Sequence, residues 1–329
     1  MADARPTVLV TELEYRKAEA TFAAATDLRC LPAPPGEADL AAAIGDTGAT
    51  AVIVGASLYS GPLYTALPAG GVVARFGAGH DGIDKDRATA AGLLCTNTPG
   101  VLNRSVAEHA MLLIGAAARA IVPMSAAMIR HAWQPATGME LEGKTLAIIG
   151  CGGIGREVAR IADGGYGMRV VGCSRPEAPP PAALPHFTSV TNDFAVAARD
   201  ADFVSLHMAA TRDNVGWLNA ARLACLSKRC WLIDTARGSL IDEAALFAAL
   251  VDGRLAGAAL DVFTREPYEP AGGSGDLRSL PNVVLTPHVG SNTVEANRRM
   301  AERALRNIVL AGRQAFAEMD LLNPAVLRS

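Results

Sequence analysis

Short apolar runs recur along this chain of 329 residues, and amphipathic stretches with helical spacing separate them. In the first hundred residues the runs predict strands and the stretches between them predict helices. The predicted strands lie at 7–10, 49–54, 72–76 and 93–95, and the predicted helices at 12–25 and 84–91. Strands that alternate with helices indicate a parallel sheet with helices packed on its faces.

A second alternation follows. Its predicted strands lie at 146–149, 169–173, 202–207, 230–235, 258–262 and 283–286, and its helices at 156–162, 219–226, 242–252 and 291–312. Between the two series, Ser105 begins a predicted helix that runs past Ala120, with Glu108 as its capping-box partner. Residues 177–185 and 272–275 have loop composition. The pattern predicts an α/β protein with two doubly wound parallel-sheet domains.

Composition limits the classes of function that fit. Hydrophobic residues make up 50% of the chain, charged residues 19%, and the net charge is −3 without any basic block, which argues for globular cores and against a nucleic-acid partner. No apolar run could span a bilayer and no signal-peptide core is present, so we expect a cytoplasmic protein and no membrane partner. The six cysteines lack metal-ligand spacing, so we expect reduced thiols and no metal.

The segment from Gly150 to Gly155 carries the strongest motif. It reads G-x-G-x-x-G, follows an apolar strand and precedes an amphipathic helix, which is the context of a dinucleotide-binding fingerprint. Gly150 allows the tight turn, Gly152 lets the backbone approach a pyrophosphate, and Gly155 lets helix and strand pack closely. The alternative is an ordinary strand-to-helix turn, but the flanks on both sides favour the fingerprint.

Polar groups follow three later strands. Arg237 comes after the strand at 230–235, where a guanidinium suits capture of a carboxylate. Asp261 and Glu266 follow the next strand, and His288 follows the last. Each alone could be a surface ion pair, a solvated carboxylate or a packed imidazole. Together, beside a dinucleotide fingerprint and at the edge where open α/β sheets bind ligands, they indicate an active site.

Through these motifs, the chain resembles the D-isomer-specific 2-hydroxyacid dehydrogenase family along nearly its whole length. The motifs that carry the resemblance are 77–84 (GAGHDGID), 150–155, 234–238 (DTARG) with Asp242 and Glu243, 257–262 (GAALDV), Glu266-Pro267 and 286–288 (TPH). The resemblance implies a Rossmann-type nucleotide domain, 101–289, inserted into a flavodoxin-like substrate domain, 1–100 plus 290–329. It also implies an oxidoreductase that reversibly reduces a small 2-oxo acid to the D-2-hydroxy acid.

The resemblance implies roles for individual residues. His288 would be the general acid that protonates the carbonyl oxygen, and Glu266 would hold its imidazole and favour the protonated form. Arg237 would bind the carboxylate of the 2-oxo acid, and the backbone N–H groups of Ala78 and Gly79 would bind the other carboxylate oxygen. The residues implied to contact the cofactor are Ser105, Gly150, Gly152, Gly153, Ile154, Gly155, Ser174, Arg175, His207, Ala209, Thr211, Thr235, Ala236, Asp261 and Gly290.

Departures from the family pattern refine the cofactor and the substrate. Ser174 stands where NAD-binding fingerprints carry an acid, and Arg175 follows it, so we expect NADP(H) to be favoured and NAD(H) to remain possible, as in NADPH-preferring glyoxylate/hydroxypyruvate reductases of the family. Alternatively, Arg175 is merely solvated. The loop 55–61 has no basic residue, which argues against a phosphorylated substrate. Leu58 and Tyr59 would form a mixed apolar and hydroxylic wall, although Tyr59 could equally be packing.

Two further departures leave the catalytic residues unchanged. Ala209 replaces a frequent proline, and Asp234 replaces a frequent asparagine. We expect glyoxylate or hydroxypyruvate as substrate and a homodimer, with helix 105–120 as the contact or only as an interdomain helix. One alternative is a dinucleotide-sensing binding protein of the same family, active in corepression with little turnover. Another is an enzyme for a different acid, such as tartronate semialdehyde, a branched 2-oxo acid or a sugar acid.

Overall fold

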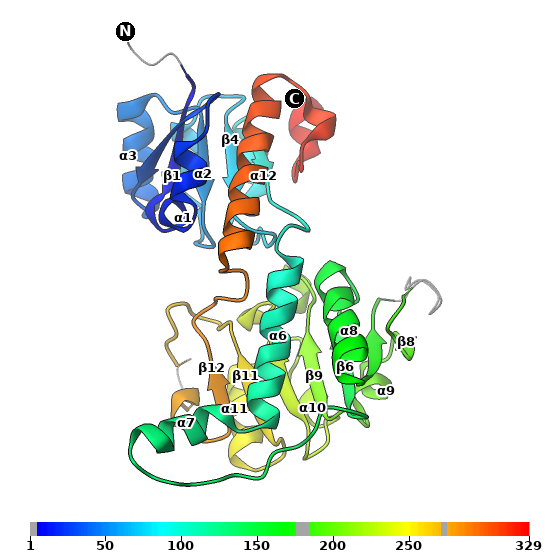
Figure 1. Ribbon diagram of the computed structural model, residues 1–329. Helices are drawn as coiled ribbons and strands as arrows, with labels where there is room; N and C mark the ends of the chain where they lie inside the picture. The colour runs from blue at the N-terminus through cyan, green and yellow to red at the C-terminus, as the bar shows by residue number, and fades with distance from the viewer. Residues whose placement is uncertain (1–4, 176–183, 271–274, 329) are drawn as a thin grey trace. The chain divides into compact units, whose positions relative to one another are not determined.

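The computed structural model describes residues 5–175, 184–270 and 275–328 and divides the chain into two compact units. Unit 1 is Met1–Leu102 with Ser291–Ser329, and unit 2 is Asn103–Gly290 (Figure 1). Most of the two predicted loops, at 177–185 and 272–275, lies outside the described residues. Assignment of unit 1 to substrate and unit 2 to dinucleotide stays a prediction.

Unit 1 contains a five-stranded parallel sheet in the order β2-β1-β3-β4-β5. The strands are β1 (Thr7–Thr11), β2 (Arg29–Ala33), β3 (Ala51–Val54), β4 (Val72–Arg75) and β5 (Leu94–Thr96). The helices are α1 (Glu12–Lys17), α2 (Glu19–Ala23), α3 (Glu37–Thr47), α4 (Leu63–Ala66), α5 (Lys85–Ala90) and α12 (Val294–Gly312). This strand order is the flavodoxin-like one, as predicted.

Helices cover both faces of this sheet. Leu40 and Ile44 of α3 pack with Leu9 and Val52 in one apolar cluster, to which α4 and α5 also contribute. Helix α12 lies against β4 and α2 (Figure 1). All four residues of β3 and of β4 are buried, because a central parallel strand has helices on both sides.

Unit 2 contains a seven-stranded parallel sheet in the order β12-β11-β10-β9-β6-β7-β8. The strands are β6 (Thr145–Ile149), β7 (Arg169–Cys173), β8 (Ser189–Thr191), β9 (Phe203–Leu206), β10 (Trp231–Asp234), β11 (Gly257–Leu260) and β12 (Val283–Leu285). The chain winds outward from β6 in both directions, which is the Rossmann order with one further strand. The predicted fold class is confirmed.

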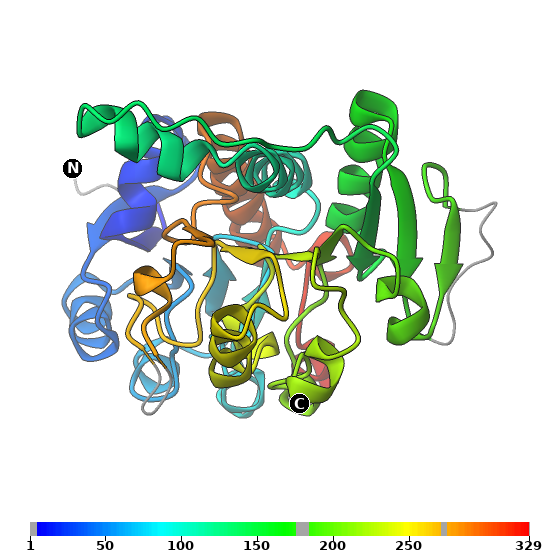
Figure 2. The ribbon, with the colours of Figure 1, turned by 90° about the horizontal axis from the view of Figure 1, so that it is seen from below.

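The helices of unit 2 are α6 (Asn103–Ala118), α7 (Ile121–Ile129), α8 (Gly153–Tyr166), α9 (Phe194–Ala198), α10 (Ala220–Leu223) and α11 (Glu243–Val251). Figure 2 shows α6 and α8 on one face of the sheet and α9, α10 and α11 on the other. Leu146 and Ile148 of β6 enter the cluster with α6 and α8, whereas Ala147 and Ile149 enter the opposite cluster. Strand alternation therefore builds two cores from one apolar run.

Several local predictions need correction. The helix predicted from Ser105 begins at Asn103, so Ser105 is a buried residue inside α6 and not a cap. It ends at Ala118 rather than running on, because Ala120 is left-handed with φ 48°, and α7 then departs at 67°. The helix predicted over 12–25 breaks at Ala18 into α1 and α2.

Strands β2 and β8 and helix α3 were missed by the pattern. β2 contains Pro32 and has one neighbour, β1, which is the edge position that tolerates proline. β8 is also an edge strand and has no buried residue. These two edge strands bury less than the central ones, so their apolar signal is weak.

Within the described residues no single helix is long and apolar enough to cross a membrane, and only the bent pair α6 and α7 passes that test when combined. The same residues contain no group of three or more His, Cys, Asp or Glu side chains able to hold a metal ion.

Candidate active site

The glycine turn between β6 and α8 is shaped by close backbone contacts. Gly150 has φ 105°, and a Cβ there would lie 2.7 Å from the carbonyl carbon of His207. A Cβ at Gly155 would lie 2.2 Å from the carbonyl oxygen of Gly150. Neither site accommodates a side chain, because backbone atoms cannot move aside as a flexible side chain can.

Gly152 differs from these two glycines. It is the N-cap of the 14-residue helix α8, and a Cβ built on it meets no atom within 4 Å. The first N–H groups of a helix have no internal partner and favour an anion. Gly153 and Ile154 begin the first turn of α8, and a Cβ at Gly153 would lie 2.4 Å from Nδ2 of Asn103 in α6. Open space before an uncapped helix N-terminus fits a dinucleotide pyrophosphate.

The loop after β9 lies against this turn. His207 Nε2 lies 2.8 Å from Oγ of Ser205, and burial lowers the pKa of His207 to about 4, so the imidazole is neutral at physiological pH. Ala209 is exposed, and its carbonyl accepts a hydrogen bond from Nδ2 of Asn214 at 2.8 Å. The N–H of Thr211 donates to Oδ1 of Asn214 at 2.7 Å. Three predicted cofactor residues thus share one loop.

Ser174 and Arg175 follow β7, the strand beside β6. The N–H of Ser174 donates to the carbonyl of Thr191 at 3.0 Å, and Arg175 is exposed. The guanidinium of Arg175 therefore lies just past the second strand of the nucleotide fold.

Four consecutive residues discussed above, from Asp234 to Arg237, lie at the end of β10 and just after it. Asp234 and Thr235 are buried, and Oδ1 of Asp234 accepts the N–H of Ala236 at 2.7 Å. Arg237 then begins a short turn, and its Nη1 donates to the carbonyl of Ala236 at 2.7 Å. A Cβ at Gly238 would lie 2.0 Å from the backbone of Phe263, so this turn packs directly on the segment after β11.

Asp261, just after β11, is the centre of a hydrogen-bond network. Its Oδ1 accepts Oγ1–H of Thr286 at 2.6 Å and the N–H of Val289 at 2.9 Å, and its Oδ2 accepts the N–H of Gly290 at 2.8 Å. Burial raises the pKa of Asp261, but these bonds and His109 outweigh burial, so the net pKa is lowered. The carboxylate is therefore charged and fixes the segment that follows β12.

His109 is the fourth partner of Asp261, and the sequence analysis did not identify it. Its Nε2 lies 3.3 Å from Oδ1 of Asp261 and 3.1 Å from Oγ1 of Thr286. His109 stands four residues after Ser105, so the two lie on one face of α6. That helical spacing was the available signal, but nothing local indicates that this face meets β11 and β12.

His288 and Glu266 are brought together from segments that follow different strands. Nδ1 of His288 lies 2.6 Å from Oε2 of Glu266, and Oε1 of Glu266 accepts the N–H of Phe263 at 3.0 Å. His288 is left-handed, with φ 53°, and its N–H donates to the carbonyl of Asp261 at 2.8 Å. Nδ1 is thus engaged by the carboxylate, which leaves Nε2 as the nitrogen able to exchange a proton with a ligand.

Glu243 supports the same segment from α11. It is buried, and its Oε1 accepts the N–H of Thr264 at 2.7 Å. Carboxylates therefore accept the first two N–H groups of the short stretch from Phe263 to Glu266.

Four predicted substrate residues lie in unit 1. Ala78 and Gly79 follow β4 and are partly exposed, and the carbonyl of Ala78 accepts Nδ2–H of Asn97 at 2.6 Å. Leu58 is 72% exposed, whereas Tyr59 is 1% exposed and packs in the unit's apolar cluster with its hydroxyl 3.4 Å from the carbonyl of Pro35. The burial of Tyr59 favours packing over an exposed wall.

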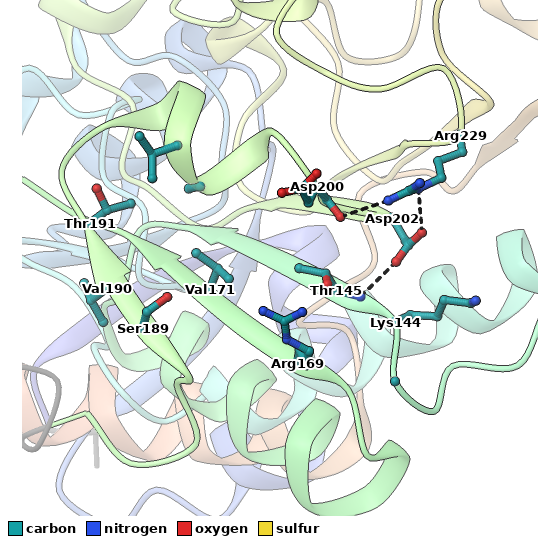
Figure 3. A pocket seen from close by; sticks show the side chains of 13 residues that line it. Lys144, Thr145, Arg169, Val171, Ser189, Val190, Thr191, Asp200, Asp202 and Arg229 are labelled. Atoms are coloured by element: carbon teal, nitrogen blue, oxygen red, sulfur yellow. Dashed lines mark hydrogen bonds and ion pairs between the residues drawn. The ribbon is translucent and has the colours of Figure 1, made fainter.

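A hollow of about 890 Å³ lies near the amino ends of β6, β7 and β8 in the unit 2 sheet (Figure 3). It is lined by residues at the starts of β6, β7 and β8, such as Thr145, Arg169 and Ser189, and contains none of the predicted site residues. Two of the lining residues, Arg229 and Asp202, form an ion pair, with Nε of Arg229 3.0 Å from Oδ1 of Asp202. Apart from Ser105 on α6, the predicted residues of unit 2 instead follow the carboxyl ends of strands, where α/β sheets bind ligands.

The chain matches a known protein family. The model of the D-isomer specific 2-hydroxyacid dehydrogenase, NAD binding domain, matches residues 111–290. The chain belongs to this family. It is therefore an NAD(P)-dependent oxidoreductase of the 2-hydroxyacid dehydrogenase family, as the motifs predicted.

Relatives with names and structures narrow the comparison. The glyoxylate reductase of Thermococcus litoralis is 37% identical over 271 residues, which cover 78% of each chain. The NADPH-dependent glyoxylate/hydroxypyruvate reductase of Sinorhizobium meliloti superposes with a TM-score of 0.79 at 30% identity, covering 93% of this chain and 94% of that one. A second structure of that enzyme, in complex with NADP and malonate, superposes with a TM-score of 0.77 at 29% identity, covering 93% of both chains.

Proposed function

We propose that this protein is an NADPH-preferring reductase of glyoxylate, hydroxypyruvate or a similarly small 2-oxo acid, and that it forms the D-2-hydroxy acid. The observation that carries the proposal is the His288–Glu266 pair, 2.6 Å apart, in the same unit as a glycine turn that fits a dinucleotide. The names of the relatives from Thermococcus litoralis and Sinorhizobium meliloti support the choice of acid.

Each catalytic residue has one task. Arg237 pairs with the carboxylate of the 2-oxo acid, because a guanidinium matches a carboxylate in shape and charge. Nε2 of His288 gives its proton to the carbonyl oxygen and takes it back in the reverse direction. Glu266 holds Nδ1 and orients the ring. The nicotinamide cofactor supplies or accepts the hydride when it is bound.

Other residues hold the cofactor. The N-terminus of α8, from Gly152 to Gly155, receives the pyrophosphate, and the loop carrying His207, Ala209 and Thr211 lines the adenosine side. Asp261 and the Thr235–Ala236 backbone orient the nicotinamide end, and Ser105 and Gly290 lie in the same unit. The predicted role of the Ala78 and Gly79 N–H groups, to bind a carboxylate oxygen of the acid, remains part of the proposal.

The preference for NADP(H) rests on Ser174 and Arg175. No carboxylate stands there to repel a 2′-phosphate, and the exposed guanidinium of Arg175 can pair with it. The NADP complex of the Sinorhizobium meliloti enzyme supports this preference.

A homodimer is part of the proposal. Large apolar side chains are exposed on α6, on α7 and just beyond them: Leu112, Ile121, Val122, Met128, Ile129 and Trp133. Exposed apolar side chains that cluster on neighbouring elements are typical of contact surfaces. Sedimentation equilibrium should give twice the chain mass. Ile129→Glu should shift the measured mass toward that of the monomer. A parent protein that is already monomeric would contradict the proposal that this surface is a dimer contact.

Initial rates with NADPH and NADH, each with glyoxylate, hydroxypyruvate, pyruvate, 2-oxoisocaproate and 3-phosphohydroxypyruvate, test the function. We expect the highest kcat/KM with NADPH and glyoxylate or hydroxypyruvate. Arg237→Lys serves as the matched variant, because lysine keeps the charge but not the paired donors. Tight dinucleotide binding without turnover of any acid would instead favour a sensor.

A further inference from the structure

The side chain of Asp234 lies at the end of β10, three residues before Arg237, and it is fully buried. Its Oδ1 accepts the N–H of Ala236 at 2.7 Å. Its Oδ2 has no hydrogen-bond partner among the described residues, and neither does Oγ1 of the following Thr235. A carboxylate that keeps its charge in such a place would lack the donors that normally compensate burial.

The groups around Asp234 do not supply that compensation. Burial raises its pKa well above 3.8, whereas the N–H groups of Ala236 and Arg237 and the charge of Arg237 act in the opposite direction. The Asp261 carboxylate, just after β11, raises the pKa of Asp234 further. On β9, Leu206 pairs with Asp234 and is followed by the neutral His207. Helix α6 contributes His109, which faces Asp261.

The position of Arg237 gives this charge state a consequence. In the proposed function, Arg237 must offer its positive charge to the carboxylate of the 2-oxo acid. A negative Asp234 in the same turn would compete for that charge, and buried charges interact strongly because little water screens them. An uncharged carboxylic acid keeps the Oδ1 acceptor that orders Ala236 without competing for Arg237.

We propose that Asp234 is a positioning residue that acts as an uncharged carboxylic acid: it holds the turn at Ala236 through Oδ1 and does not compete with the substrate carboxylate for the charge of Arg237. The inference rests on the proposed function for its kinetic consequence, but the charge state of Asp234 can be measured without turnover.

Urea unfolding of the parent protein and of Asp234→Asn from pH 5 to pH 9 measures that charge state. A folded-state pKa above the unfolded one means that stability falls as pH rises, because the unfolded carboxyl releases a proton that the folded one keeps. Asparagine has no such proton. The unfolding constant of the parent, divided by that of Asp234→Asn, should therefore rise about tenfold for each pH unit until the folded-state pKa is reached. The parent thus loses stability relative to Asp234→Asn as pH rises.

Asp242→Asn is the matched control. Asp242 is exposed, and its Oδ1 accepts the N–H of Ala245 at 3.0 Å as the N-cap of α11, a task that asparagine also performs. Its stability difference from the parent should stay constant between pH 5 and pH 9. The same constant difference in Asp234→Asn would mean that Asp234 is already ionised at pH 5, and it would overturn the proposal.

Steady-state kinetics with glyoxylate and saturating NADPH measure the consequence for Arg237. We expect KM of the parent to rise several-fold as the pH passes through the folded-state pKa of Asp234, and KM of Asp234→Asn to stay flat while kcat values remain similar. Asp234→Ala, which loses the Oδ1 acceptor, should have a raised KM at every pH. Equal pH profiles of KM in the parent and Asp234→Asn would overturn the role in substrate binding. If no 2-oxo acid is turned over, the proposed function fails and the unfolding data alone decide the charge state.

Discussion

The imidazole of His288 and the carboxylate of Glu266 meet at 2.6 Å, from Nδ1 to Oε2, although 22 residues separate them in the chain. Both remain partly exposed, with about a third of each side chain accessible, 29% for His288 and 34% for Glu266. A charged or polar pair that is held in place and still reaches solvent can exchange a proton with a ligand, whereas a fully buried pair could not.

Replacing His288 should abolish proton transfer but spare cofactor binding. We expect His288→Ala to lower kcat by about 10² to 10⁴, the usual contribution of a general acid. Glu266→Gln keeps a hydrogen-bond acceptor for Nδ1 but no charge, so its loss of kcat should be smaller. NADPH affinity, followed by fluorescence, should stay near that of the parent in both. Turnover that survives in His288→Ala would assign the proton to another group.

Binding of the 2′-phosphate of NADP(H) should depend on Arg175. Removing one charge-assisted hydrogen bond in Arg175→Ala should raise KM for NADPH by roughly 10- to 100-fold, while KM for NADH stays nearly unchanged. Ser174→Asp adds the carboxylate typical of NAD-binding fingerprints and should reverse the preference. If Arg175→Ala affects both cofactors equally, Arg175 does not select the phosphate.

Two glycines of the fingerprint should separate folding from binding. Gly150→Ala puts a Cβ 2.7 Å from the His207 backbone at φ 105°, so it should lower the melting temperature. The Cβ of Gly152→Ala meets nothing within 4 Å, so the fold should be nearly as stable as the parent. If the pyrophosphate lies against Gly152, NADPH affinity should fall in that variant, as titration calorimetry would show. Unchanged affinity in Gly152→Ala would place the pyrophosphate elsewhere.

The Asp261 network should stabilise unit 2 in a pH-dependent way. Burial raises the pKa of Asp261, but its hydrogen bonds outweigh burial and lower it below 3.8, so the group contributes stability above its unfolded pKa and loses it as pH falls through the folded one. Asp261→Asn turns a donor toward the N–H groups of Val289 or Gly290 and should cost about 1 to 3 kcal/mol at pH 7.

Urea unfolding at pH 7 and at progressively lower pH tests this. The gap between the parent and Asp261→Asn should narrow as pH falls below 3.8. Thr286→Val removes one donor to the same carboxylate and should show a smaller loss at pH 7. A gap that does not depend on pH would mean that the charge of Asp261 contributes nothing to stability.

The apolar pattern was sufficient for most of the architecture. Central strands such as β3, β6 and β9 are buried along their whole length, so their sequences are mostly apolar runs that can be recognised without a structure. The edge strands β2 and β8 were missed, because one-sided pairing leaves them partly exposed and removes that signal.

The family, the fold class and the glycine turn at Gly150 could all be predicted from the sequence. The sequence also predicted that Arg237, Glu266 and His288 each follow a parallel strand. These features are local, since a motif, a strand and the residue after it are contiguous in the chain. The tertiary structure alone decided which of these residues meet. It joined His288 to Glu266, brought His109 of α6 to Asp261, and buried Asp234 and Tyr59. Such contacts join residues that are far apart in the chain. They depend on how strands and helices pack together, which no local sequence pattern encodes.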